Sequence, residues 1–206
     1  MDNPNSWFYP HAEVLRDTFA KNHDVVLVHS VAELAPGDCL FILSCEKLIK
    51  PATLALHKNN LVIHSSDLPA GKGWSPLTWQ ILEGKNDITS TLFEAVEAVD
   101  AGVIYLQETI QFAGHELTDE LHAAQGESIK RLVLEFVEKY PAIIEKGRVQ
   151  SGEESFYPRR KLEDSQLDVN KTIADQFDLL RVVDNERYPA FFTHRGQTYL
   201  IKIYKK

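Results

Sequence analysis

The stretch Leu61-Val62-Ile63-His64-Ser65-Ser66-Asp67-Leu68-Pro69 decides the fold. An apolar run of strand character carries His64 to its end, and Ser, Ser, Asp and Pro then break the strand. Open α/β sheets keep their ligands just past the carboxyl ends of buried strands, where polar side chains face a crevice. The stretch therefore predicts an α/β sheet with a functional site at the end of this strand.

The flanking sequence alternates apolar strands with helices. Before the stretch we expect a helix at 6–22, a strand at 24–29, a helical turn at 31–34, a strand at 39–43 and a short helix at 51–57. After it we expect a helix at 76–83, a hairpin-like strand pair at 89–95 and 103–110, and a long amphipathic helix at 118–140. Continuous apolar strands between helices imply a mainly parallel sheet that is covered on both faces.

The chain is long enough, at 206 residues, for one domain with a small appendage. The sequence becomes polar from Gly147, and a basic and aromatic run follows at 155–161. We therefore divide the chain into a catalytic core at residues 1–146 and a small C-terminal α+β extension at residues 147–206. The extension is expected to contain a helix that ends near Arg181 and a strand at 198–204.

Charge and cysteine content limit the partners. A net charge of −8 disfavours a nucleic-acid-binding surface, which needs a clustered basic patch. No apolar run approaches the roughly 20 residues of a membrane span, so we expect no membrane partner. Cys39 and Cys45 are too few for a secreted disulfide framework and lack metal-ligand spacing, so we expect a cytoplasmic protein.

A second polar loop supplies a candidate partner for His64. Asp100-Ala101-Gly102 stands at the entrance to the strand expected at 103–110. A carboxylate within reach of an imidazole orients the ring, which favours proton transfer or stabilisation of a developing oxyanion. A histidine at the end of a strand is more often a structural residue, and the sequence alone does not show that the two side chains meet.

Other chemistries lack their signatures. No Gly-x-Ser-x-Gly elbow is present, and the eight histidines form no His-x-x-x-His pattern, so we expect neither a serine hydrolase nor a metal site. The run Arg159-Arg160-Lys161 has two interpretations. It is either a solvated surface or, beside Phe156 and Tyr157, a grip for a phosphate and a stacked base.

Residues 60–105 resemble the catalytic domain of the folate-dependent formyltransferases. Residues 62–69 match the family's Asn-x-His-Pro-Ser-Leu-Leu-Pro, and Lys72-Gly73-Trp74-Ser75-Pro76 matches its Arg-Gly-x-x-Pro. Asp100-Ala101-Gly102 matches its Asp-x-Gly loop. The form of these motifs looks most like short bacterial enzymes that formylate amino sugars carried on nucleotides.

The resemblance implies a Rossmann-like sheet flanked by helices. The family's first strand has no counterpart before the helix expected at 6–22. It implies transfer of a formyl group from N10-formyltetrahydrofolate, without a metal, to the amino group of a nucleotide-linked 4-amino-dideoxy sugar used in polysaccharide biosynthesis. His64, held by Asp100, would stabilise the oxyanion and move protons, or Asp100 would organise a water that relays the proton. Val62 stands where the family has its catalytic Asn, so Asn60, Ser65 and Ser66 are the candidates to supply the missing hydrogen bond.

The resemblance also suggests binding residues. The candidates to hold the folate are Cys45, Glu46, Lys47, Leu48, Glu97, Ala98 and Val99. The candidates to hold the acceptor are Ser65, Ser66, Lys72, Trp74, Tyr157, Arg159 and Arg160. The expected partner is a small nucleotide sugar, and a homodimer is compatible with the sequence.

Three alternatives stay open. The acceptor could be another amine, on methionyl-tRNA or glycinamide ribonucleotide, although the charge of −8 and the small extension disfavour a tRNA. Val62 in place of Asn could leave an inactive protein that binds folate without turnover. A related hydrolase would release formate in the absence of an amine acceptor.

Overall fold

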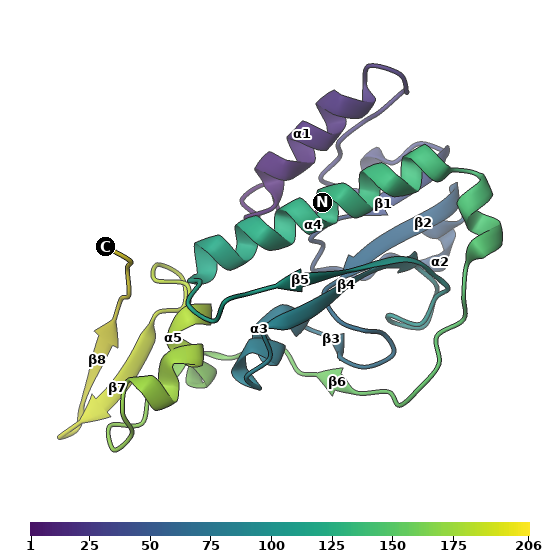
Figure 1. The fold of residues 1–206 in the computed structure, drawn as a ribbon. Coiled ribbons are helices and arrows are strands. Elements are labelled where there is room, and N and C mark those ends of the chain that lie inside the picture. Colours follow the sequence, from purple (N-terminus) through teal and green to yellow (C-terminus); the bar gives the residue numbers. More distant parts are fainter.

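A computed structural model describes the whole chain, residues 1–206, and has the α/β architecture that the sequence predicts (Figure 1). Its centre is a four-stranded sheet in the order β1-β2-β4-β5. The strands are β1 (Gly37–Ile42), β2 (His57–His64), β4 (Asp87–Glu94) and β5 (Ile104–Gln111). Between β1 and β2 lies the short helix α2 (Pro51–Leu54), close to its expected position.

The strand pairing corrects one detail of the expected sheet. Only β1 and β2 run parallel, whereas β4 is antiparallel to both of its neighbours. The sheet is therefore mixed, not mainly parallel. For β4 and β5 the reason is that a loop with no helix joins them, and a parallel pair would need a longer crossover.

The strand expected at residues 24–29 is wrong, because this segment does not join the sheet. An apolar run forms a strand only when a neighbouring strand pairs with its backbone groups. Here the carbonyl of Val28 accepts a hydrogen bond from the Met1 amino group at 3.2 Å, and no strand pairs with the segment. The residues ahead of the first helix also form no strand.

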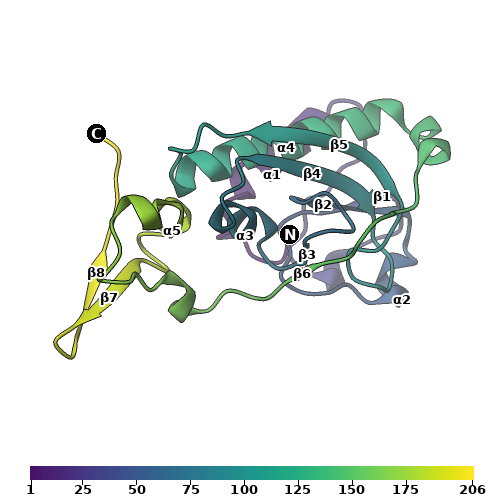
Figure 2. The ribbon, with the colours of Figure 1, turned by 60° about the horizontal axis from the view of Figure 1, so that its bottom comes forward.

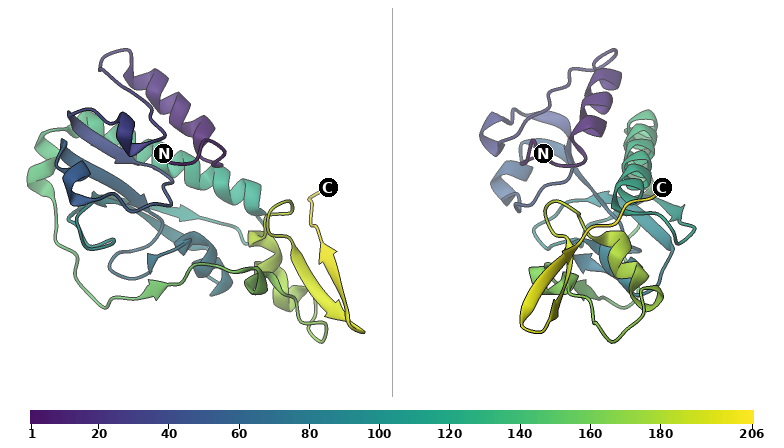
Figure 3. Two further views of the ribbon diagram at one scale, coloured as in Figure 1. Left: turned by 180° about the vertical axis from the view of Figure 1, so that it is seen from behind. Right: turned by 90° about the vertical axis from the view of Figure 1, so that its left-hand side faces the viewer.

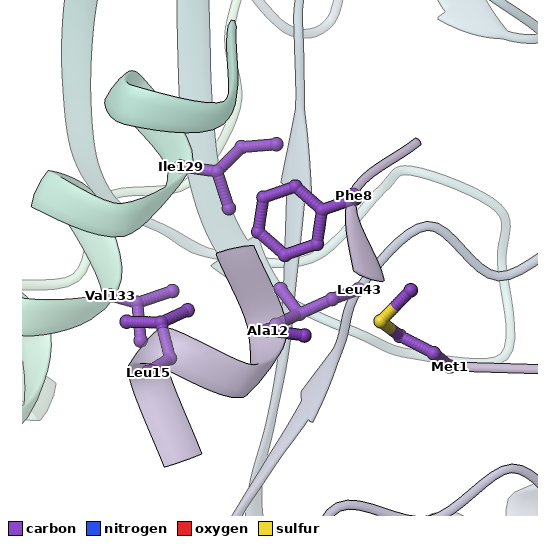
Figure 4. Packing of buried hydrophobic residues seen from close by; sticks show 7 residues of the cluster. All are labelled: Met1, Phe8, Ala12, Leu15, Leu43, Ile129 and Val133. Carbon is purple, nitrogen blue, oxygen red and sulfur yellow. The ribbon is translucent and has the colours of Figure 1, made fainter. Parts of the chain in front are cut away.

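Two helices pack together beside the sheet. The helix α4 (Thr118–Lys139) lies along one face of the sheet, and α1 (Tyr9–Phe19) lies beside α4 (Figure 1). Proline is tolerated in the first turn of α1 because the amide it lacks would have no partner there. Figure 4 shows the buried contact, which is made by Met1, Phe8, Ala12, Leu15, Leu43, Ile129 and Val133.

The layer between α4 and the sheet is fully buried. Leu132 and Phe136 of α4 meet Leu61 of β2 and Leu92 of β4, and each of the four is at most 1% exposed. Burying one such side chain contributes about 2 kcal/mol. This contact fixes β2, and with it the position of His64, under α4.

The chain after α4 returns to the core before it leaves for the C-terminus. It forms β6 (Phe156–Tyr157), which pairs in parallel with β3 (Lys72–Gly73) on the side of the core away from α4 (Figure 2). The helix α3 (Pro76–Leu82) follows β3, as expected. The division of the chain at residue 146 stays a prediction.

The C-terminal elements stand at one end of the molecule (Figure 3). They are α5 (Phe177–Val182) and the hairpin of β7 (Ala190–His194) and β8 (Gln197–Ile201). The predicted terminal strand is therefore present but ends earlier. No helix of the protein combines the length and the apolar character that crossing a membrane requires.

Arg181 on α5 joins these elements to the core. Its side chain is 1% exposed and bonds Glu116 at 3.2 Å, Asp178 at 3.0 Å and the Asn86 side chain at 2.9 Å. A guanidinium taken out of water needs such partners, because an unpaired buried charge is strongly unfavourable.

Arg181→Met should lower the free energy of unfolding by about 3 kcal/mol, because Glu116 then loses its buried partner. Urea denaturation measures the change. The matched control is Arg131→Met, since Arg131 pairs with Glu108 but is 59% exposed, and this change should cost under about 1 kcal/mol. Equal losses in both variants would contradict the role of Arg181 as a buried joint.

His122 on α4 makes the stability of the protein depend on pH. Its ring stacks on Trp7 with centroids 4.5 Å apart and planes 5° apart. Burial lowers the pKa of His122 below the usual 6.5. Between these two pKa values the unfolded chain binds a proton that the folded protein does not, so stability falls as the pH drops below 6.5.

The urea midpoint of the wild type should therefore be lower at pH ~5.5 than at pH ~7.5. His122→Phe keeps an aromatic ring on Trp7 but cannot bind a proton, so its midpoint should fall less over the same range. His194→Asn, at an exposed position, is the control and should behave as the wild type. An unchanged pH dependence in His122→Phe would show that His122 does not cause it.

Candidate active site

The end of β2 and the loop between β4 and β5 bring His64 and Asp100 together. His64 is the last residue of β2, and Asp100 lies in the loop that precedes β5. Nε2 of His64 is 4.0 Å from Oδ2 of Asp100, and the two side chains are only 10% and 13% exposed. At this distance the two groups do not share a direct hydrogen bond.

A backbone carbonyl fixes the tautomer of His64. Nε2 lies 2.8 Å from the carbonyl oxygen of Gly71. Because a carbonyl oxygen only accepts hydrogen bonds, Nε2 carries the hydrogen. Nδ1 makes no hydrogen bond within the protein, so the neutral ring keeps a free lone pair on Nδ1. His64 can therefore accept a proton at Nδ1.

The Asp100 loop is tightly constrained. Asp100 has a left-handed backbone with φ of 51°, which Asp tolerates better than most residues. Its Oδ2 accepts a hydrogen bond from the Gly73 amide at 2.9 Å. Gly102 passes so close to β4 that a Cβ atom would lie 1.7 Å from the carbonyl oxygen of Glu94. Only glycine fits at this position.

A cavity of about 350 Å³ opens beside the pair, and both His64 and Asp100 line it. Its other walls are mostly apolar and include Val62 and Phe93. Among the residues predicted to hold the folate, those that line the cavity are Cys45, Glu46, Lys47, Leu48, Glu97 and Val99, whereas Ala98 does not. Burial raises the pKa of the Cys45 thiol, which keeps it neutral. No three His, Cys, Asp or Glu side chains are grouped so as to hold a metal ion.

Asn60 does not reach the pair. It lies four residues before His64 on β2, and an extended strand of that length spans about 13 Å. Its Nδ2 instead donates to the carbonyl of Leu54 at 3.1 Å. The prediction that Asn60 takes part in catalysis is therefore wrong. Val62 contributes an apolar side chain to the cavity wall.

Several residues predicted to hold the acceptor are engaged within the protein. Lys72 is 3% exposed, and its Nζ pairs with Glu154 at 2.6 Å. The hydroxyl of Ser65 accepts a hydrogen bond from Gln125 at 2.7 Å. The hydroxyl of Ser66 is buried without a partner. None of the three residues lines the cavity.

Tyr157 and Arg160 also have structural partners. The Tyr157 hydroxyl donates to Glu83 at 2.9 Å, and burial raises the pKa of Tyr157. The guanidinium of Arg160 donates to the carbonyl of Asp164 at 3.0 Å, and burial lowers its pKa. Tyr157 holds β6 and Arg160 holds the segment after it, and neither side chain is free to bind a ligand.

Trp74 remains at the cavity, and Arg159 lies against it. Trp74 lines the cavity and is 39% exposed. The Arg159 guanidinium lies 4.7 Å from the centre of the Trp74 ring and 3.4 Å from the Glu46 carboxylate. These three side chains come from distant parts of the sequence and form one border of the cavity.

Two side-chain amides near the site were not identified from the sequence. Gln150 donates to the carbonyls of Asp100 and Gly102, and Gln80 donates to the carbonyl of Ser65. No local pattern marks Gln150, because it bonds a loop far away in the sequence.

Comparison with known proteins identifies the family. The sequence profile of the formyl transferase family matches residues 10–136, more than half of the chain. The chain belongs to this family and is an enzyme of formyl transfer.

Solved structures share the fold. Methionyl-tRNA formyltransferase from Clostridium thermocellum is 21% identical over 97% of this chain and 88% of its own, with a TM-score of 0.79. HypX from Aquifex aeolicus, in complex with tetrahydrofolic acid, is 20% identical over 81% of this chain and 29% of its own, with a TM-score of 0.70. A sugar N-formyltransferase from Shewanella is 15% identical over 82% of this chain and 70% of its own, with a TM-score of 0.65. Identities this low establish a shared fold.

Gly102→Ala should destabilise the protein by about 2–3 kcal/mol, because the added methyl group forces the loop away from β4. Urea denaturation checks this value. Gly84→Ala is the control: it has φ of 81°, and nothing lies within 4 Å of its Cβ position, so it should cost only about 1 kcal/mol of backbone strain. A smaller loss for Gly102→Ala than for Gly84→Ala would contradict the close approach.

Proposed function

We propose that the enzyme transfers the formyl group of N10-formyltetrahydrofolate to the amino group of a nucleotide-linked amino sugar. The observation that carries the proposal is the His64–Asp100 pair, 4.0 Å apart, in the wall of a mostly apolar cavity. Family membership supplies the reaction class, and the cavity supplies the argument for the substrates.

The cavity suits the ring system of a folate. Small-molecule sites are mostly apolar with a few polar groups at fixed positions, which matches these walls. The Asp2 carboxylate accepts hydrogen bonds from the amides of Glu46 at 3.0 Å and Lys47 at 2.9 Å, and so fixes the loop that lines one wall. The tetrahydrofolic acid bound to HypX, which has this fold, supports the same ligand here. When bound, the folate would supply the activated formyl group.

His64 would move the proton of the reaction. The acceptor nitrogen forms a bond to the formyl carbon, and the bond from that carbon to N10 breaks. A proton must therefore pass from the acceptor nitrogen to N10. The free Nδ1 of His64 can take this proton and then return it, while the Asp100 carboxylate stabilises the imidazolium.

The border of the cavity favours a nucleotide sugar. The guanidinium of Arg159 can bind a phosphate, and the exposed face of Trp74 can stack a base or a sugar. A tRNA would need an extended basic surface, which a chain of net charge −8 does not favour. A sugar N-formyltransferase with this fold supports the same choice.

Val62 favours one second candidate, a protein that binds folate without turnover. The resemblance places the family's catalytic Asn at this position. The side-chain amide of Asn60 does not replace it, because that amide donates to the carbonyl of Leu54. Such a protein would keep the cavity and lose the reaction.

The test is turnover of N10-formyltetrahydrofolate with a panel of UDP- and dTDP-linked 4-amino sugars. We expect one acceptor to be formylated, and His64→Ala and Asp100→Ala each to lower kcat by about 100-fold or more, as for lost acid–base groups. His23→Ala and Asp38→Ala change exposed residues and are the matched controls.

Folate binding without turnover of any acceptor would select the second candidate. Release of formate without an acceptor would indicate a hydrolase. Undiminished turnover in both His64→Ala and Asp100→Ala would exclude the roles proposed for these residues.

A further inference from the structure

Gln150 reaches the Asp100 loop from the segment that follows α4. Two backbone hydrogen bonds between Ile104 and Arg148, 2.8 and 2.9 Å long, dock this segment beside the start of β5. The docking directs the Gln150 side chain to the loop. Its Nε2 donates to the carbonyl oxygens of Asp100 and Gly102, both at 2.9 Å.

The chemistry of the two acceptors fixes how Gln150 must be oriented. Carbonyl oxygens only accept, so the amide nitrogen must face the loop and uses both of its hydrogens there. The amide oxygen is left buried without a partner. Leaving a buried acceptor unpaired is unfavourable. Gln150 therefore makes its two hydrogen bonds to the loop while its amide oxygen makes none.

The loop requires such a contact because its backbone is strained. Asp100 has φ of 51°, a conformation that a residue with a side chain keeps only where its surroundings hold it. In this conformation Oδ2 accepts from the Gly73 amide and faces His64. A relaxed loop would turn the carboxylate away from both.

We propose that Gln150 is a positioning residue that holds Asp100 toward His64 through the backbone carbonyls of the loop. The proposal rests on the proposed function, since it assigns Gln150 to the support of the pair that would move the proton. Gln150 acts through Asp100 and does not itself touch the reacting atoms.

Two variants test whether Gln150 acts through its hydrogen-bond donor or only through the shape of its side chain. Gln150→Glu keeps the shape and places a carboxylate oxygen against the two carbonyls. Gln150→Leu removes the donor without adding charge. The matched control is Gln176→Glu, because Gln176 also donates to loop carbonyls, those of Asp168 at 3.1 Å and Thr172 at 3.2 Å, in the C-terminal part of the chain.

The primary measurement is hydrogen exchange of the Gly73 amide by NMR, since this amide donates to Asp100. Exchange should be about ten-fold faster or more in both Gln150 variants and unchanged in Gln176→Glu. With the acceptor found in the turnover assay, kcat should fall by about ten-fold or more while KM stays unchanged.

Unchanged Gly73 exchange in both Gln150 variants would overturn the proposal. So would an equal fall in kcat in Gln176→Glu, because it would indicate general destabilisation. If Gln150→Glu does not fold, Gln150→Leu decides the outcome. If the wild type shows no turnover, the proposed function fails, and the Gly73 exchange still decides whether Gln150 holds Asp100.

Discussion

The hydrogen bond from the Gly73 amide to the Asp100 carboxylate is the contact on which the site depends. It joins the loop after β2 to the loop between β4 and β5. The carbonyl of Gly71, two residues earlier, binds His64, so the short piece 71–73 orients both members of the pair. This piece is itself held from outside by β6, so closely that a Cβ atom on Gly73 would lie 2.5 Å from the carbonyl oxygen of Tyr157.

Around this contact, most polar side chains are already satisfied within the protein. Lys72 is paired with Glu154, and the hydroxyl of Ser65 is bound by Gln125. Each of these bonds leaves one polar group fewer to bind a ligand and makes the surroundings of the cavity more rigid. The proposed function therefore assigns the chemistry of the cavity to few groups, chiefly Nδ1 of His64 and the Asp100 carboxylate. A site with few free groups and rigid walls can hold its reactants in one geometry.

The sequence predicted those features that local patterns encode. The helix at 118–140 and the strand that ends at His64 were confirmed within a few residues, because periodicity and strand breakers are local signals. Strand pairing is not local: residues 24–29 have the composition of a strand but no partner in the sheet. Lys72 was predicted to hold the acceptor, and its neutralising Glu154 lies too far along the chain for any spacing rule to find it. Gln150 carries no signal at all in a single sequence.

The parallel pairing of β3 with β6 has a consequence for how this chain can be recombined with its relatives. A crossover at residue 147 would exchange Gln150, Glu154 and Tyr157 together with the C-terminal hairpin. The segments that orient His64 and Asp100 would then be supported by residues of the relative. A crossover after β6 would transplant α5 and the hairpin while leaving that support native. Such a crossover would still separate Arg181 from Glu116 and Asn86, so the incoming α5 would need its own partners for these two core residues.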